Sequence, residues 1–93
     1  KRNMTNDSDI HKRQNQGIKA KDLLENETFN IVFQKLEEKY LEDFSNSKPD
    51  DTQIREQSYL SLQNLRKLRQ EISTLVTDGK IASAQIDNLN KKG

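Results

Sequence analysis

Two apolar stripes, each with the spacing of one helix face, occupy the centre of the chain. The first stripe is Phe29, Val32, Phe33, Leu36, Tyr40 and Phe44, and the second is Ile54, Ser58, Ser61, Leu65, Leu68, Ile72 and Leu75. Steps of three and four residues indicate amphipathic helices. The segment Lys48-Pro49-Asp50-Asp51 between them is typical of a helix end followed by a helix start. The pattern predicts an all-α fold with an antiparallel helical hairpin at its centre.

Capping residues give the expected bounds of this hairpin, residues 22–79. Asn26 is suited to cap its first helix, about residues 27–44, and Asp50 is suited to cap its second, about residues 51–77. Asp78-Gly79 has the composition of a left-handed helix stop. We therefore expect the second helix to end before Asp78.

Weaker helical patterns flank the hairpin. Residues 1–21 are basic and poor in apolar groups, which indicates either a partly disordered arm or a weak helix from about Ser8 to Glu25, with residues 1–8 disordered. Gly17 inside that helix lowers its stability by about 1 kcal/mol relative to Ala. Residues 80–93 carry Ala82, Ile86 and Leu89 at helical spacing, which predicts a short C-terminal helix and a tail.

Folding the chain back at Pro49 is expected to set aromatic residues against aliphatic or small ones. Phe33 then lies level with Leu65, and the small Ser58 and Ser61 leave room for Tyr40 and Phe44. The predicted hairpin core is Phe29, Phe33, Leu36, Tyr40, Phe44, Leu65, Leu68 and Ile72. Outside it lies a second apolar surface made of Tyr59, Leu60, Leu62 and Val76. That surface is covered either by a partner or by the terminal segments of the chain itself.

The composition favours association. The chain has 93 residues, of which 30% are hydrophobic and 33% charged, so its core must be thin. A single hairpin leaves half of each apolar face in water. We therefore expect the chain to form a homo-oligomer or to dock on a larger protein.

The residues that carry enzyme chemistry are scarce. His11 stands in a polar segment, and the acidic pairs Glu37-Glu38 and Glu42-Asp43 lie on the predicted exposed face of a helix. A general acid or base needs partners fixed around it in a dry pocket. The sequence therefore predicts no catalytic residue, cofactor, metal or small-molecule substrate, and no enzyme activity. Its apolar runs are too short to span a membrane, so we expect a soluble protein.

Arg66, Lys67 and Arg69 form a basic cluster in the second hairpin helix. Together with the basic arm, this cluster is a candidate for contacts with nucleic-acid phosphates, whose affinity falls as salt rises. The alternative is neutralisation within the fold, because the expected register brings Glu25 and Glu27 close to the cluster. Internal neutralisation is the simpler interpretation.

One pattern of helix faces and caps covers about residues 20–85. It consists of Leu23-Leu24, Phe29, Phe33, Leu36 and Tyr40-Leu41, then Pro49-Asp50-Asp51-Thr52, Arg55-Glu56, Leu60, Leu62 and Leu65, and finally Asp78-Gly79-Lys80-Ile81. This pattern resembles small helical-hairpin proteins of tailed bacteriophages that are encoded among head and DNA-packaging genes. Where those proteins often carry Trp, this chain has Phe44 and Tyr59.

The resemblance implies a setting for the protein and no activity. It suggests a component of virion or head assembly, in the virion or the host cytoplasm, that oligomerises or docks on a head, portal or packaging protein. The alternative is a nucleic-acid-binding packaging factor resembling a small terminase subunit. Salt dependence separates the two, because docking through apolar contacts does not weaken as salt rises.

Overall fold

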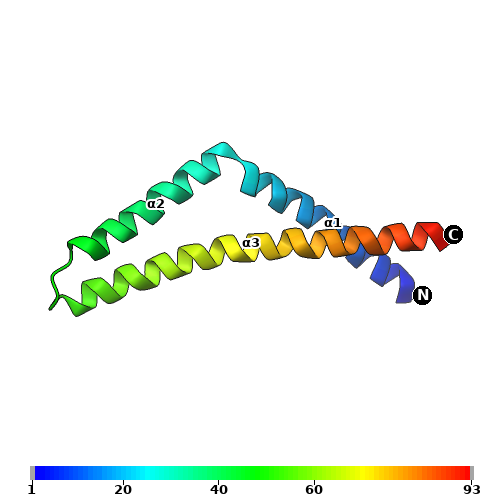
Figure 1. The fold of residues 1–93 in the computed structure, drawn as a ribbon. Helices are drawn as coiled ribbons and strands as arrows, with labels where there is room; N and C mark the ends of the chain where they lie inside the picture. The colour runs from blue at the N-terminus through cyan, green and yellow to red at the C-terminus, as the bar shows by residue number, and fades with distance from the viewer. Residues whose placement is uncertain (1, 93) are drawn as a thin grey trace. The chain divides into compact units, whose positions relative to one another are not determined.

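The structure is a computed structural model that describes residues 2–92. Within these residues the chain forms three α-helices and no strand (Figure 1). Helix α1 spans Arg2–Glu25, α2 spans Glu27–Asn46 and α3 spans Thr52–Lys92. The prediction of an all-α fold is confirmed.

The N-terminal segment, for which the sequence left open an arm or a weak helix, forms the helix α1. Its backbone is helical from Arg2 onward, and Lys1 lies outside the described residues. Few apolar residues and an internal glycine make α1 unstable alone. Packing accounts for its formation, because Gly17 and Ala20 on one face are buried.

Helix α2 begins at the predicted cap. The side chain of Asn26 accepts a hydrogen bond from the backbone N–H of Phe29, at 2.8 Å. At the other end, Ser47 turns back on the helix, since its N–H donates to the carbonyl of Phe44 at 3.2 Å and its hydroxyl donates to the same oxygen at 2.6 Å. These two bonds satisfy a terminal carbonyl and end α2 at Asn46, two residues beyond the expected bound.

The turn before α3 is closed by Asp51, not by Asp50. The N–H of Asp51 donates to the carbonyl of Lys48 at 2.9 Å, and the N–H of Lys48 donates to the Asp51 carboxylate at 3.2 Å. The carbonyl of Asp51 then accepts from the N–H of Arg55 at 3.0 Å. The predicted cap Asp50 is therefore wrong by one residue, and α3 begins at Thr52.

Helix α3 runs for 41 residues without interruption. The predicted stop at Asp78-Gly79 is wrong, because within the described residues no glycine has the positive φ of a left-handed cap. A separate C-terminal helix is therefore absent from residues 80–92, which continue α3. The close packing of Gly79, described below, gives this glycine another role.

The contacts of the chain fall into two units, each built from one helix packed on one part of α3. The central unit is Glu25–Gln70, which contains α2 and the first part of α3. The terminal unit joins residues 2–24, from α1, with residues 71–92, from the last part of α3.

Candidate interaction surface

In each unit, α3 packs against its neighbouring helix through a line of regularly spaced positions. This seam row has steps of four and three residues and consists of Ser58, Leu62, Leu65, Arg69, Ile72, Val76, Gly79, Ser83 and Ile86. All but Arg69 are buried or half-buried. The mean step of 3.5 residues is the repeat of helices that pack along their whole length.

In the central unit, arginines of α3 lie on phenylalanine rings of α2. The guanidinium of Arg69 lies 4.9 Å from the ring centre of Phe33 and donates to the side-chain oxygen of Asn30 at 3.2 Å. The guanidinium of Arg55 lies 4.5 Å from the ring centre of Phe44. Such contacts stabilise by about 0.5–1 kcal/mol at exposed sites, and the aliphatic stem of Arg covers apolar surface as well.

The predicted basic cluster is largely engaged inside this unit. The guanidinium of Arg66 pairs with the carboxylate of Glu37 at 3.1 Å, and Arg69 contacts α2 as described. The acid beside Arg66 is therefore Glu37 and not the expected Glu25 or Glu27. Lys67 is exposed on α3.

The seam row corrects the predicted core. The apolar stripe predicted from the sequence shares Ser58, Leu65 and Ile72 with the seam row. Its other members lie beside the seam row and not in it. Leu68, predicted to be core, is 52% exposed, whereas Leu62, predicted to face a partner, is 8% exposed. The physical reason is Arg69, a charged residue that fills a seam position by lying on Phe33.

The other residues of the predicted core and partner surface differ in their burial. Phe33 is buried and lies 6.0 Å from the half-buried Phe29, measured between ring centres. The remaining half-buried members of the predicted core are Leu36, Tyr40, Phe44 and Leu65. Ile72 is buried but belongs to the terminal unit, so it is not part of the core formed with α2. Of the predicted partner surface, Tyr59 and Leu60 are exposed and Val76 is half-buried.

Beside the seam lies a second row on α3, which we call the flanking row. It recurs every seven residues and consists of Ile54, Ser61, Leu68, Leu75, Ala82 and Leu89. Its four large members are between 41% and 53% exposed. The row on the other side of the seam is mostly polar, with Tyr59, Arg66, Ser73, Lys80 and Asp87. A further apolar row beside the seam row is typical of a helix in a bundle with more than one neighbour.

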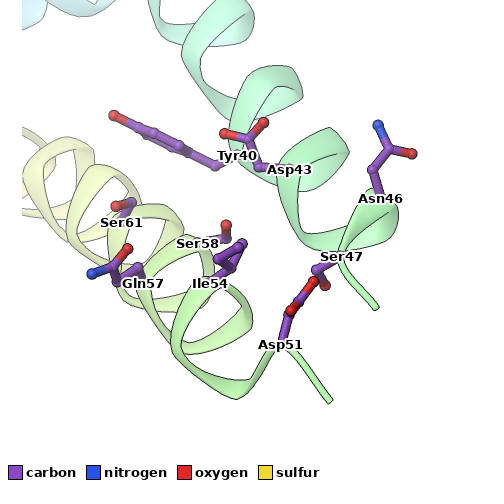
Figure 2. A pocket seen from close by; sticks show the side chains of 9 residues that line it. All are labelled: Tyr40, Asp43, Asn46, Ser47, Asp51, Ile54, Gln57, Ser58 and Ser61. Atoms are coloured by element: carbon purple, nitrogen blue, oxygen red, sulfur yellow. The ribbon is translucent and has the colours of Figure 1, made fainter. Parts of the chain in front are cut away.

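An open pocket of about 380 Å³ lies in the central unit, near the turn, and its lining includes Ile54 and Ser61 of the flanking row. Figure 2 shows Tyr40 and Asp43 of α2 across from Ile54, Ser58 and Ser61 of α3. The small serines leave the expected space beside Tyr40. The lining mixes hydroxyl, amide and carboxylate groups with one large aliphatic side chain.

In the terminal unit, two glycines bring α1 and α3 into close contact. A Cβ atom on Gly17 would lie 2.6 Å from the Cα of Gly79. Ala20 and Ala82 continue the contact and are 5% and 0% exposed. Beyond the glycines, Gln14 donates to the hydroxyl of Ser83 at 3.0 Å. Small side chains allow this approach, as they do wherever helix backbones cross closely.

Sequence reasoning missed this contact. It interpreted Gly17 as a weak point of a helix and Gly79 as a helix stop. The available signal was the repeated spacing, because each glycine is followed three residues later by an alanine, Ala20 and Ala82. A neighbouring apolar groove of about 330 Å³ is lined by Gln16, Lys19, Ala20, Leu23, Ile72 and Leu75.

The residues considered for catalysis are not gathered into a site. His11 is exposed, and Glu38 accepts a hydrogen bond from Gln34 at 3.3 Å on the surface of α2. Within the described residues, no group of three or more His, Cys, Asp or Glu side chains is placed to hold a metal ion. The same part of the chain has no helix with the length and apolarity needed to cross a bilayer.

Comparison with known proteins finds no matching family model, no matching curated protein and no matching solved structure.

Proposed function

We propose that this chain is a non-enzymatic helical interaction protein, which associates with copies of itself or docks on a larger protein. The observation that carries the proposal is the exposure of large apolar side chains. Twelve of them are at least 40% exposed, and among the described side chains no large one is completely buried. Removing such surface from water stabilises an assembly by about 25 cal/mol per Å².

The proposal includes an antiparallel hairpin of α2 and the first part of α3 as the folded core. Its support is the order of the contacts in the central unit. Asn30 and Phe33, early in α2, contact Arg69, whereas Phe44, late in α2, contacts Arg55. A contact order of this kind is what two antiparallel neighbours produce.

The proposed partner surface includes Tyr59 and Leu60, and the partner is a second copy or a larger protein. A tailed-phage setting, with a head, portal or packaging protein as the partner, is supported by the sequence resemblance alone. In that setting the protein acts in the virion or in the host cytoplasm.

The alternative, a nucleic-acid-binding packaging factor, has weaker support. It requires Arg66 and Arg69 to contact phosphates, although both already contact α2. A binding titration with duplex DNA at low and high salt tests it, because phosphate contacts lose affinity steeply as salt rises.

Thermal unfolding followed by circular dichroism tests the proposed function. If a second copy covers the apolar side chains, Tm rises with protein concentration. If the partner is another protein, Tm is constant but the free chain binds a hydrophobic dye such as ANS through its exposed surface. A constant Tm without dye binding contradicts the proposal.

A further inference from the structure

We infer that the open pocket near the turn, which we call the turn pocket, binds an alkylammonium group. This group is the cationic end of a lysine side chain or of a small aliphatic amine. All the residues that line the turn pocket lie between Tyr40 and Ser61, on the last part of α2, the turn and the first part of α3 (Figure 2). The site is therefore complete within the central unit.

The charge of the turn pocket favours a cation. Asp43 and Asp51 supply two carboxylates, and within residues 2–92 no Lys, Arg or His side chain joins the lining. The carboxylate of Asp43 has no ion pair or hydrogen bond with any other described residue. The carboxylate of Asp51 accepts one hydrogen bond, from the N–H of Lys48. The neighbouring guanidinium of Arg55 lies on the ring of Phe44.

The two helix ends near the turn pocket leave this charge in place. The negative end of α2 and the positive end of α3 both border the turn, so the helix dipoles oppose each other there. The carboxylates therefore set the sign of the ligand.

Ser58 indicates a polar ligand independently of these charges. It is 8% exposed, and Figure 2 shows its hydroxyl pointing toward Tyr40 and Asp43 on α2. This hydroxyl has no hydrogen-bond partner among the residues that the structure describes. A buried polar group without a partner destabilises the fold. An N–H donor of a ligand in the turn pocket would supply that partner, because a hydroxyl oxygen accepts.

The directions of the acceptors fit an ammonium group better than a planar guanidinium. Tyr40 and Asp43 approach the turn pocket from α2, and Ser58 approaches it from α3. The three donors of an ammonium diverge from one atom, whereas a guanidinium holds its donors in one plane and suits paired oxygens on one side. Ile54, also in the lining, can cover the methylene groups beside the ammonium.

Nuclear magnetic resonance titration with butylammonium tests the inference, because butylammonium is the lysine side chain without its backbone. We expect backbone N–H signals of residues 40–61 to shift saturably as butylammonium is added. Butanol, which is neutral and of nearly the same shape, should shift them little, since the carboxylates select the charge. No saturable shift with butylammonium, or equal shifts with butanol, overturns the inference.

Three variants show whether the named side chains hold the ammonium. Ser58→Ala should raise the Kd for butylammonium about twofold to tenfold, as expected for one lost hydrogen bond. Asp43→Asn should raise it about twofold to fivefold, because it removes an exposed ionic contact. Glu42→Gln is the matched control, since Glu42 is the exposed neighbour of Asp43 and does not line the turn pocket. A control that weakens binding as much as Asp43→Asn overturns the inference.

A second probe separates the two sources of the ammonium. Acetyl-lysine N-methylamide carries the same group on a peptide backbone. If it binds at least as tightly as butylammonium, the ligand is a lysine side chain of a partner; if only butylammonium binds, the ligand is a free amine. Failure of both probes overturns the inference. Sedimentation and ANS binding measure the apolar surface and not the turn pocket, so the proposed function and this site can each fail while the other stands.

Discussion

At the scale of single residues, the side chains that matter most are the ones whose chemistry is ambiguous in a sequence. Gly17 and Gly79 are needed because two helix backbones meet there, and neither has a positive φ. Arg55 and Arg69 occupy positions that usually hold aliphatic residues, and they do so by lying on phenylalanine rings. In each case the role of the residue is set by a neighbour distant in the sequence.

Gly79→Ala should destabilise the chain although Ala is the better helix former. Its Cβ would lie 2.7 Å from the Cα of Gly17, and a backbone atom cannot rotate away. Overpacking of about 1–3 kcal/mol outweighs a gain in helix propensity of about 1 kcal/mol. We expect Tm to fall by about 5 °C in circular dichroism. Asn15→Ala, at an exposed site on α1, is the control, and a Tm for Gly79→Ala at or above that of the control contradicts the close contact.

Arg69→Ala should cost about 1 kcal/mol of unfolding free energy, because it removes the contact with Phe33 and the hydrogen bond to Asn30. Lys67→Ala, at an exposed position two residues earlier, should change stability by less than about 0.5 kcal/mol. Urea denaturation measures both. Equal losses would show that the Arg69 contact does not stabilise the fold.

At the scale of elements, the sequence predicted the helices better than their faces. The turn around Pro49 and the Asn26 cap were readable because both depend on local chemistry. The seam of α3 was not readable. The seam row and the apolar stripe predicted from the sequence share Ser58, Leu65 and Ile72. Arg69 belongs to the seam row because it lies on Phe33, but a pattern of polarity alone places a charged residue outside the core.

The length of α3, like its seam row, could not be predicted from local sequence rules. Asp78-Gly79 is a helix stop by local rules, but Gly79 packs on Gly17 and the helix continues to Lys92. The terminal unit was therefore missed as a unit, because a close crossing of two helices depends on a residue pair and not on a local signal. The flanking row was present in the predicted stripe, although it was interpreted as core.

The seam can be tested by comparing neighbouring leucines of α3. Leu62→Ala should cost about 2–3 kcal/mol, because Leu62 is buried against α2 and its loss leaves a cavity. Leu60→Ala should change the unfolding free energy by less than about 0.5 kcal/mol, since Leu60 is exposed. Urea denaturation gives both values, and a larger loss for Leu60→Ala would place the seam on another face.

The continuity of α3 can be tested by nuclear magnetic resonance. We expect helical Cα chemical shifts from Thr77 through Ile81, because the backbone there is helical throughout. A stop at Asp78-Gly79 would instead give Gly79 non-helical shifts and a rapidly exchanging amide next to it.

At the scale of the whole molecule, a single chain leaves much of its apolar surface uncovered. Each unit packs one helix on α3, and the single chain leaves the large members of the flanking row exposed. Small domains with thin cores often gain their missing stability by oligomerisation. The proposed partner, a second copy or a larger protein, would cover these side chains.

Sedimentation equilibrium of the purified chain over a wide range of concentrations tests this account most directly. If a second copy covers the exposed apolar side chains, the mass rises with concentration above that of the 10.8 kDa chain. A chain that stays at the mass of one copy at every concentration and binds no ANS contradicts the proposed function.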